Sequence, residues 1–249
     1  MNTLTVISHI FNEEYLLPFW LEYHSKMFDH GIILDYCSTD KSIDIIKTVC
    51  PTWTIIQTRN IGTDGKPNFN AKLVDDEVED IEKTVQGYKI ALNTTEFFTI
   101  NTSKEEFVKS LEKGWIYVGK TYSVIHPVPT TPKSLEDFMN GMTHIYSYKY
   151  NRGARFLHSD ENLLYTCGRH YHMCDHSKDR DATYYIRWIG FYPWNSHTIH
   201  RKLQIQTNIP TSDKLHGYGV QHITNEQLLQ SEYETYVSSS TPFLAALRF

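Results

Sequence analysis

Two spacings of apolar residues alternate along the first half of the chain. Short apolar runs rich in β-branched residues are separated by segments whose apolar residues recur at helical spacing. Asn12 is the predicted N-cap of the first helix, and Gly87 is the predicted C-cap of the third. We predict strands at 4–10 (LTVISHI), 31–36 (GIILDY), 52–58 (TWTIIQT) and 89–93 (KIALN), and helices at 11–28, 38–50 and 71–87.

This alternation of strand and helix predicts an α/β fold with a mostly parallel sheet and right-handed crossovers. Such an order is typical of the opening half of a doubly wound nucleotide-binding domain. A capped helix at 103–113 and a long strand at 115–125 follow, before the proline-rich segment HPVPTTPK. We expect one domain over 1–249, with a nucleotide-binding half at 1–125 and a more irregular half at 126–249.

Charge and composition narrow the class of partner. The formal net charge of −5 is spread along the chain without a basic block, so we expect no nucleic-acid partner. No signal-like segment opens the chain and no window resembles a membrane span, so we expect a cytoplasmic protein for which peripheral membrane contact stays open. The four cysteines lack zinc-site spacing and are expected to be reduced thiols.

Polar residues follow the predicted parallel strands at the ends where ligands bind in such sheets. Asp35 ends the second strand, where a carboxylate can accept a hydrogen bond from a uracil N3–H or a ribose hydroxyl. It can equally cap the turn into the next helix, and both interpretations stay open. The other candidates at these strand ends are His9, Asn12, Glu13, Ser38, Asn93, Thr95 and Glu96.

Three stretches together carry a resemblance to a known family. ISHIFNEEYLLPFWLEYH, GIILDYCSTDKS and GYKIALNTTEF resemble the start of GT-A fold glycosyltransferases of the family 2-like type. RKLQIQTNIPTSDKLHGYGVQH resembles their acceptor-side half. The resemblance implies a nucleotide-sugar donor across the strand ends, with Asp35 on the base or ribose. We expect the donor to be UDP-linked, Arg59 to contact it, and the acceptor to be a glycan or small molecule. The resemblance also implies transfer with inversion.

The same resemblance implies a divalent metal at the end of the fourth strand. The family pattern there is Asp-x-Asp, often followed by Glu-Phe, and it aligns with Asn93, Thr95 and Glu96, so both carboxylates of the pattern are missing. A metal ion offsets the charge that develops on the departing diphosphate. With Glu96 and Thr95 as ligands and His170 available to complete the set, we expect Mn²⁺ or Mg²⁺ to bind weakly.

A general base and cationic groups complete the expected chemistry. The candidate bases are Asp76, Asp80, Asp160 and His222. Most acids of the run DDEVED (75–80) are expected on a solvent-facing helix surface, although Asp76 and Asp80 lie one turn apart and can enter the site together. The cations that can meet the leaving-group charge are Arg59, Arg169, Arg187, Arg201 and Lys202, each of which can instead be a surface ion-pair partner.

Two classes of function therefore stay open. One is a glycosyltransferase, and the other is a nucleotide or nucleotide-sugar binding protein that has lost turnover on the same fold. A nucleotidyltransferase would require a glycine-rich phosphate loop near the N-terminus, and ISHIFNEE contains no glycine.

Overall fold

The computed structural model describes residues 3–62, 65–149, 153–159, 163–219 and 222–243. The chain divides into two compact units. Unit 1 comprises Met1–Thr121 and Gly153–Ile186, and unit 2 comprises Tyr122–Arg152 and Arg187–Phe249. Residues 153–186, which follow the proline-rich segment, thus belong with the N-terminal residues in unit 1.

Unit 1 contains the alternating strands and helices that the apolar pattern predicts. Two of its strands, β6 and β9, continue into the first residues of unit 2. Its elements are β1 (Leu4–Ile10), α1 (Leu17–His24), β2 (His30–Asp35), α2 (Ser42–Val49), β3 (Thr54–Gln57), α3 (Ala71–Thr84), β4 (Tyr88–Ala91), β5 (Glu96–Ile100), α4 (Lys104–Ser110), β6 (Ile116–Ile125), β8 (Ala154–His158), the 3₁₀ turn η1 (His176–Lys178) and β9 (Asp179–Trp188).

The strands of unit 1 form a mixed sheet in which the four strands β1 to β4 are parallel to one another. The order is β6-β8-β4-β1-β2-β3, and β9 pairs with both β5 and β6. Strand β1 pairs in parallel with β2 and β4, and β2 with β3, whereas β8 runs antiparallel to β4 and β6. The predicted α/β fold with a mostly parallel sheet flanked by helices is confirmed.

The register brings three parallel strands to a common end. Ile10 of β1 lies opposite Asp35 of β2, and Asp35 lies opposite Gln57 of β3. We call this end of the sheet the carboxyl edge. Loops that follow these strands therefore leave the sheet side by side, as ligand-binding loops do in open parallel sheets.

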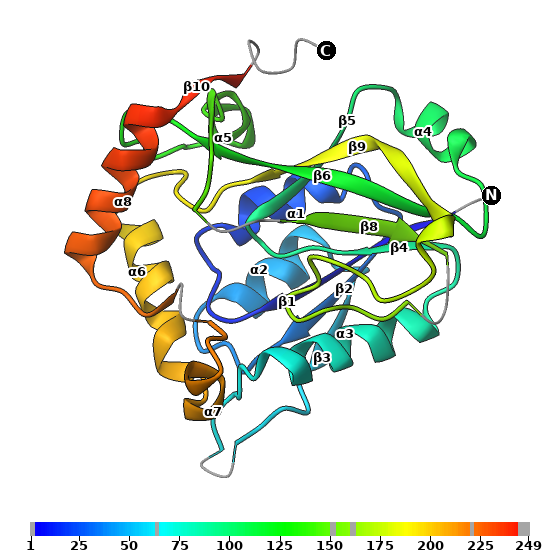
Figure 1. Ribbon diagram of the computed structural model, residues 1–249, viewed down its shortest axis with the longest axis horizontal. Coiled ribbons are helices and arrows are strands. Elements are labelled where there is room, and N and C mark those ends of the chain that lie inside the picture. Colours follow the sequence, from blue (N-terminus) through cyan, green and yellow to red (C-terminus); the bar gives the residue numbers. More distant parts are fainter. Residues whose placement is uncertain (1–2, 63–64, 150–152, 160–162, 220–221, 244–249) are drawn as a thin grey trace. The chain divides into compact units, whose positions relative to one another are not determined.

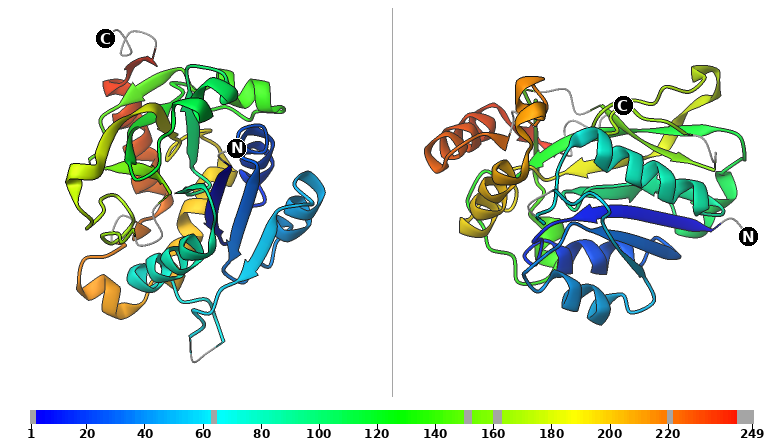
Figure 2. Two further views of the ribbon diagram at one scale, coloured as in Figure 1. Left: turned by 90° about the vertical axis from the view of Figure 1, so that its right-hand side faces the viewer. Right: turned by 90° about the horizontal axis from the view of Figure 1, so that it is seen from below.

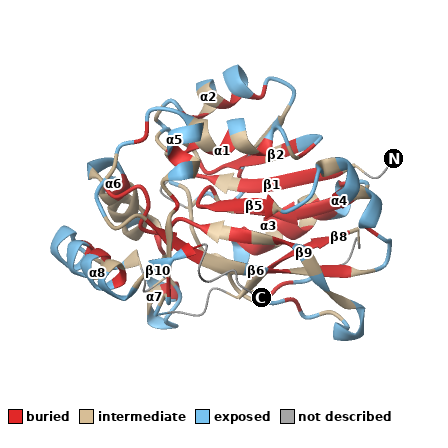
Figure 3. Ribbon diagram, turned by 90° about the horizontal axis from the view of Figure 1, so that it is seen from above, coloured by how far each residue is buried: buried red, intermediate tan, exposed pale blue. Residues whose placement is uncertain are grey.

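Helices cover both faces of the parallel strands (Figure 1). The two views of Figure 2 place α2 and α3 on opposite faces. Val78 and Val85, on and just after α3, pack with Ile7 of β1 and Ala91 of β4 in one buried cluster. Figure 3 shows that buried residues dominate β1, β2 and β5, as expected for strands covered on two faces.

Some predicted helix ends differ from the structure. Helix α1 begins at Leu17 with Leu16 as N-cap, so Asn12 is not its cap. Asn12 instead has a φ of 50°, in the left-handed region that asparagine tolerates. Helix α3 ends at Thr84 with Val85 as C-cap, ahead of Gly87. Ser103 does cap α4, in a capping box with Glu106.

Unit 2 is built around aromatic side chains. Trp194 stacks on Tyr233 with centroids 4.7 Å apart, and both belong to a buried cluster that includes Phe191 and Tyr236.

None of the helices in the described part of the chain is long and apolar enough to cross a bilayer. Besides the ends of β6 and β9, unit 2 contains α5 (Leu135–Asn140), β7 (His144–Tyr146), α6 (Ser196–Gln204), the 3₁₀ turn η2 (Ile205–Asn208), α7 (Thr211–Leu215), α8 (Glu226–Ser239) and β10 (Thr241–Pro242).

Candidate functional site

The loops after β1 and β2 are joined by hydrogen bonds at the carboxyl edge. The Asn12 amide donates to the Ser38 hydroxyl (3.1 Å), and the Asn12 side-chain oxygen accepts from the Thr39 amide (2.8 Å). The Glu13 amide donates to the Ser42 hydroxyl at the start of α2 (2.9 Å). These three predicted residues, Asn12, Glu13 and Ser38, therefore fix the two loops against each other.

Asp35 is buried at the end of β2 and caps the turn that follows it. Its Oδ1 accepts from the Ser38 amide (3.0 Å) and its Oδ2 from the Gln57 side chain (2.9 Å), while only 2% of the residue is exposed. The structure thus shows the turn-capping role. A contact between Asp35 and a base or ribose stays a prediction.

Glu77 of α3 is an acceptor for four donors at the ends of β2 and β3. Its Oε2 accepts from Tyr36 Oη (2.7 Å), Thr58 Oγ1 (2.7 Å) and Asn60 Nδ2 (2.6 Å), and its Oε1 accepts from the Arg59 amide (2.7 Å). Burial, with Glu77 beside it, raises the pKa of Tyr36 well above its usual range, so the phenol stays protonated and donates. This network attaches α3 to the carboxyl edge.

Glu96, at the start of β5, forms a buried two-point ion pair with Arg155 of β8. Nε of Arg155 donates to Oε2 (2.8 Å) and Nη2 to Oε1 (2.6 Å), and the two side chains are 2% and 1% exposed. Oε2 also accepts from the Asn93 amide (2.9 Å). Both carboxylate oxygens are therefore occupied by donors of the protein itself.

Arg169 lies at the turn of a short hairpin that follows β8. An isolated antiparallel bridge between Tyr165 and His172 defines this hairpin, which we call the 165–172 hairpin. The amide of Arg169 donates to the Thr166 carbonyl (2.9 Å), and Gly168 and Arg169 have φ values of 84° and 58°. These left-handed residues turn the chain so that the Arg169 side chain enters the interior of unit 1.

The guanidinium of Arg169 connects three elements of unit 1. Nη1 donates to Oδ1 of Asp75 on α3 (2.7 Å), and Nη2 donates to Oδ1 of Asn93 (3.0 Å). Nη2 also lies 3.3 Å from Nδ1 of His9 on β1. Burial raises the pKa of Asp75, and the Arg169 charge and the Gly168 amide act against that rise.

His9 is neutral in this setting. Burial, followed by the nearby Arg169 and Arg155 charges, lowers its pKa from 6.5 to about 3, although the Glu96 charge acts in the opposite direction. Because the guanidinium can only donate, Nδ1 of His9 accepts and the ring proton belongs on Nε2. His9, Asp75, Asn93, Glu96, Arg155 and Arg169 together form what we call the guanidinium cluster.

The predicted metal ligands do not fit a divalent cation as they are arranged. Arg155 holds both oxygens of Glu96, and its Nη1 lies 3.1 Å from Nδ1 of His170. The Asn93 side-chain oxygen accepts from Arg169 (3.0 Å), and Thr95 is buried with 7% exposure. A metal ion at Glu96 would share its carboxylate with a guanidinium already in contact, and the repulsion opposes binding.

The predicted bases lie outside the guanidinium cluster. Asp76 pairs with Lys72, and Asp80 pairs with Arg59 (2.6 Å) and Lys83 (2.8 Å), on the exposed side of α3. His222 belongs to unit 2, where its amide donates to the Gly219 carbonyl (2.9 Å), and Asp160 lies outside the described residues. The remaining predicted cations, Arg187, Arg201 and Lys202, also belong to unit 2.

The acids of α3 that face the interior are not the predicted pair. Asp75, Glu77, Glu79 and Glu82 are each at most 5% exposed, which corrects the expectation that most acids of this run face solvent. Glu79 accepts from the Tyr165 amide (2.8 Å), so it holds the base of the 165–172 hairpin. One signal was available in the sequence, because Asp75, Glu79 and Glu82 recur at the helical spacing of the buried face that contains Val78.

Arg155 was also missed, and no local motif marks it. It lies 59 residues beyond Glu96 in the chain, on a short strand whose other residues are mostly apolar. An arginine in such a strand is a signal of a buried ion pair only when the acid opposite is known.

No protein-family model matches the chain. No curated protein matches it either. Among solved structures, one similar chain is the mannosyltransferase PcManGT from Pyrobaculum calidifontis in complex with GDP-Man and Mn²⁺, at 17% identity and a TM-score of 0.35, covering 51% of this chain and 36% of that one.

Two further solved structures show the same kind of likeness. Residues 1–349 of TarS from S. aureus in complex with UDP are 14% identical with a TM-score of 0.40, covering 63% of this chain and 46% of that one. Glucosyl-3-phosphoglycerate synthase from Mycobacterium tuberculosis, in complex with Mn²⁺, UDP and glucosyl-3-phosphoglycerate, is 16% identical with a TM-score of 0.33, covering 49% and 44%. This chain spans less than half the length of each of the three, and at these identities the likeness concerns the fold alone.

Proposed function

We propose that unit 1 binds a UDP-linked sugar at the carboxyl edge and that the protein transfers the sugar, with inversion, to a glycan or small-molecule acceptor. The observation that carries the proposal is the set of side chains gathered at the ends of β1, β2 and β3. They offer an aromatic surface for a base and an exposed guanidinium for a diphosphate, while Asp35, buried and already accepting two hydrogen bonds, stays the candidate for a ribose contact. Asp76, Asp80 and His222 remain the candidate bases.

The aromatic surface is formed by Phe11 and Phe69. Phe11 directly follows β1, and its ring meets that of Phe69 edge to face with centroids 5.3 Å apart. Phe69 in turn lies 5.2 Å from Tyr36, which directly follows Asp35. Both phenylalanines are only half-buried, so a base can stack on them beside the end of β2.

Arg59 is the cation best placed for the diphosphate. It follows β3, and its backbone amide is held by Glu77 (2.7 Å) while its side chain is 60% exposed. Its only charged contact among the described residues is the exposed pair with Asp80, which contributes little in water. A diphosphate can therefore replace Asp80 at the guanidinium at small cost, while Asp80 keeps its pair with Lys83 (2.8 Å).

The guanidinium cluster has a supporting role in this proposal. Two arginines and two acids neutralise one another there, and His9 is uncharged, so the cluster holds the ends of β1 and β4 in place. Nε of Arg169 is buried without a hydrogen-bond partner among the described residues. Because Glu96 does not fit a metal, we propose that arginine side chains replace Mn²⁺ or Mg²⁺ in meeting the donor's charge.

The second candidate function is nucleotide-sugar binding without turnover. The Glu96–Arg155 pair favours it, because the one acid that remains in the aligned motif is held in an internal ion pair. Both functions predict donor binding, and they differ only in whether the donor is consumed. The same motifs also resemble those of majastridin, a glycosyltransferase-like bacterial protein, but the three structures described do not support that more specific match.

Calorimetric titration with UDP, GDP, UMP and UDP-sugars, each with Mn²⁺ or with a chelator, tests the donor site. We expect UDP to bind more tightly than UMP, with an affinity that the chelator leaves unchanged. A strict requirement for Mn²⁺ would contradict the proposed role of the arginines, and absence of any nucleotide binding would contradict the proposed function. Release of UDP from a bound UDP-sugar on addition of acceptor sugars then separates the transferase from the binding protein.

A further inference from the structure

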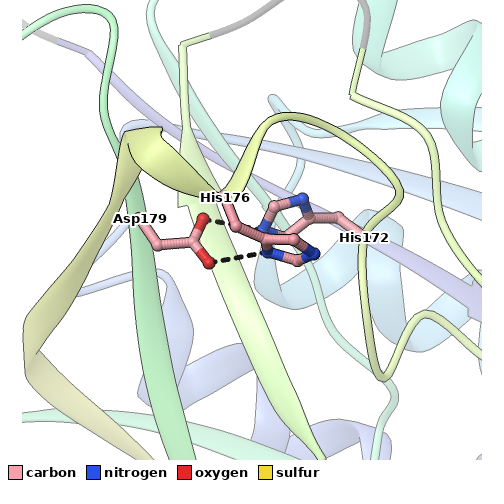
Figure 4. A group of neighbouring side chains, drawn as sticks. All are labelled: His172, His176 and Asp179. Atoms are coloured by element: carbon pink, nitrogen blue, oxygen red, sulfur yellow. Dashed lines mark hydrogen bonds and ion pairs between the residues drawn. The ribbon is translucent and has the colours of Figure 1, made fainter.

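Three potential metal-ligating side chains meet in unit 1 apart from the guanidinium cluster. His172 ends the 165–172 hairpin, His176 opens the turn η1, and Asp179 is the first residue of β9. One ligand atom from each lies within 4.8 Å of the other two. Figure 4 shows both imidazoles turned toward the one carboxylate.

The contacts within this group use the atoms that a metal would use. Nε2 of His172 lies 2.8 Å from Oδ1 of Asp179, and Nδ1 of His176 lies 3.0 Å from Oδ2. Donor atoms around a zinc ion are roughly 3 to 4 Å from one another, so small side-chain movements suffice to admit an ion. Two imidazoles and a carboxylate are a ligand set that zinc accepts, with a fourth position left for water.

The surroundings fix one ligand and leave the other accessible. His172 is 3% exposed and its ring packs edge-on against Phe156 with centroids 4.9 Å apart. His176 has 69% of its side chain exposed, and its ring lies 4.6 Å from that of His172. An ion can therefore reach the group from solvent on the His176 side and meet a ligand that is already held in place.

Proton positions must change when an ion binds. The Cys174 amide donates to Nδ1 of His172 (3.3 Å), so Nε2 carries the ring proton and donates it to Asp179. A metal ion bound to Nε2 of His172 requires the ring proton to be on Nδ1. The 3.3 Å hydrogen bond from the Cys174 amide to Nδ1 is then lost.

We propose that His172, His176 and Asp179 bind one Zn²⁺ ion and that the ion holds the 165–172 hairpin against the start of β9. The hairpin bears Arg169 at its turn, so the ion steadies the segment that supplies a guanidinium to the end of β1. Zn²⁺ binding itself does not depend on the proposed donor site. In this proposal the divalent metal binds at Asp179 instead of at Glu96.

Calorimetric titration of Zn²⁺ into the chelator-treated full chain tests the site. We expect one ion per chain in the wild type, and Asp179→Asn or His176→Gln to weaken binding at least about tenfold, because each removes a direct ligand. The matched controls are Asp181→Asn, an exposed acid of the same strand, and His200→Gln, an exposed histidine of α6. Equal affinity in a variant and its control, or no binding by the wild type, would overturn the site.

Amide hydrogen exchange tests whether the ion holds the hairpin. The amides of Thr166 and Arg169 donate within the hairpin, to the carbonyls of Tyr171 and Thr166 (both 2.9 Å). Saturating Zn²⁺ is expected to slow their exchange in the wild type and in Asp181→Asn, and to leave it unchanged in Asp179→Asn. Zn²⁺ binding that leaves these two amides unaffected in the wild type would overturn the proposed effect on the hairpin.

Discussion

Arg155 contacts both carboxylate oxygens of Glu96, at 2.8 and 2.6 Å, in the interior of unit 1. The same guanidinium donates to the carbonyl of Arg169 (2.7 Å), at the turn of the 165–172 hairpin. One arginine thus joins the start of β5 to the hairpin that holds a second arginine. Glu96, which we expected to be a metal ligand, is therefore part of a structural ion pair in this chain.

Removal of one partner of this pair is expected to be costly. Glu96→Gln or Arg155→Met leaves a buried charge without its counterion, and each should lower the free energy of unfolding by about 3–5 kcal/mol. The double variant Glu96→Gln with Arg155→Met should recover much of that loss, since no charge remains buried. Urea unfolding of the four proteins measures the coupling.

An exposed pair provides the control for that cycle. Lys109 and Glu105 of α4 are 2.9 Å apart with side chains 72% and 79% exposed, and Glu105→Gln should change stability by less than about 0.5 kcal/mol. A loss in Glu96→Gln as small as the loss in this control would show that the pair at Glu96 is solvated and open to a metal.

Replacement of Asp35 is expected to lower the stability of the folded protein, whether or not Asp35 also contacts a nucleotide. Asp35→Ala removes the acceptor of the Ser38 amide and of the Gln57 side chain, both in a buried setting, and should cost about 1–3 kcal/mol. Thermal unfolding compared with Asp44→Ala, an exposed acid of α2, measures the difference. Equal melting temperatures in the two variants would remove the turn-capping role and return Asp35 to the donor site.

The predicted strands were recovered because their pattern is local. The run at 4–10 coincides with β1, and those at 31–36 and 52–58 overlap β2 and β3, since runs of β-branched residues between turn residues favour strands. Asn12 is a residue whose role the local pattern did not predict. Its side chain meets a backbone amide 27 residues away, and its positive φ serves that contact instead of a helix start.

The candidate site was predicted less completely, for a reason that lies in its long-range pairing. His9, Asn93, Glu96 and Arg169 were identified individually from strand ends and family resemblance, and the structure brings them together. What joins them is Arg155, and Asp75 completes the set, through contacts that span 59 and 94 residues. Charged residues of these types are usually exposed, so composition alone favoured the opposite placement.

Arg59 gives a direct test of the donor site. Arg59→Gln should weaken UDP binding roughly tenfold through loss of a charged hydrogen bond to the diphosphate, and should leave uridine binding unchanged. Lys83→Gln is the matched control, because Lys83 also pairs with Asp80 (2.8 Å) on the same exposed side of α3. Calorimetry that finds the same UDP affinity in both variants would exclude Arg59 from the site.

The neutral state of His9 predicts how stability depends on pH. The folded-state pKa is about 3, against 6.5 for an unperturbed histidine, so the unfolded chain takes up a proton in this interval that the folded chain does not. Above pH 6.5 His9 is neutral in both states and does not lower the free energy of unfolding. As the pH falls from 6.5 toward 3, the free energy of unfolding decreases by about 1.4 kcal/mol per pH unit for this single proton. Because a glutamine does not titrate, His9→Gln should reduce the slope of unfolding free energy against pH between 6 and 4 by about that amount.

Urea unfolding at several pH values measures both slopes, with His200→Gln, a variant of an exposed histidine, as the control that keeps the wild-type slope. Identical slopes in the wild type and His9→Gln would mean that His9 is protonated beside Arg169, and the guanidinium cluster would then carry an additional positive charge.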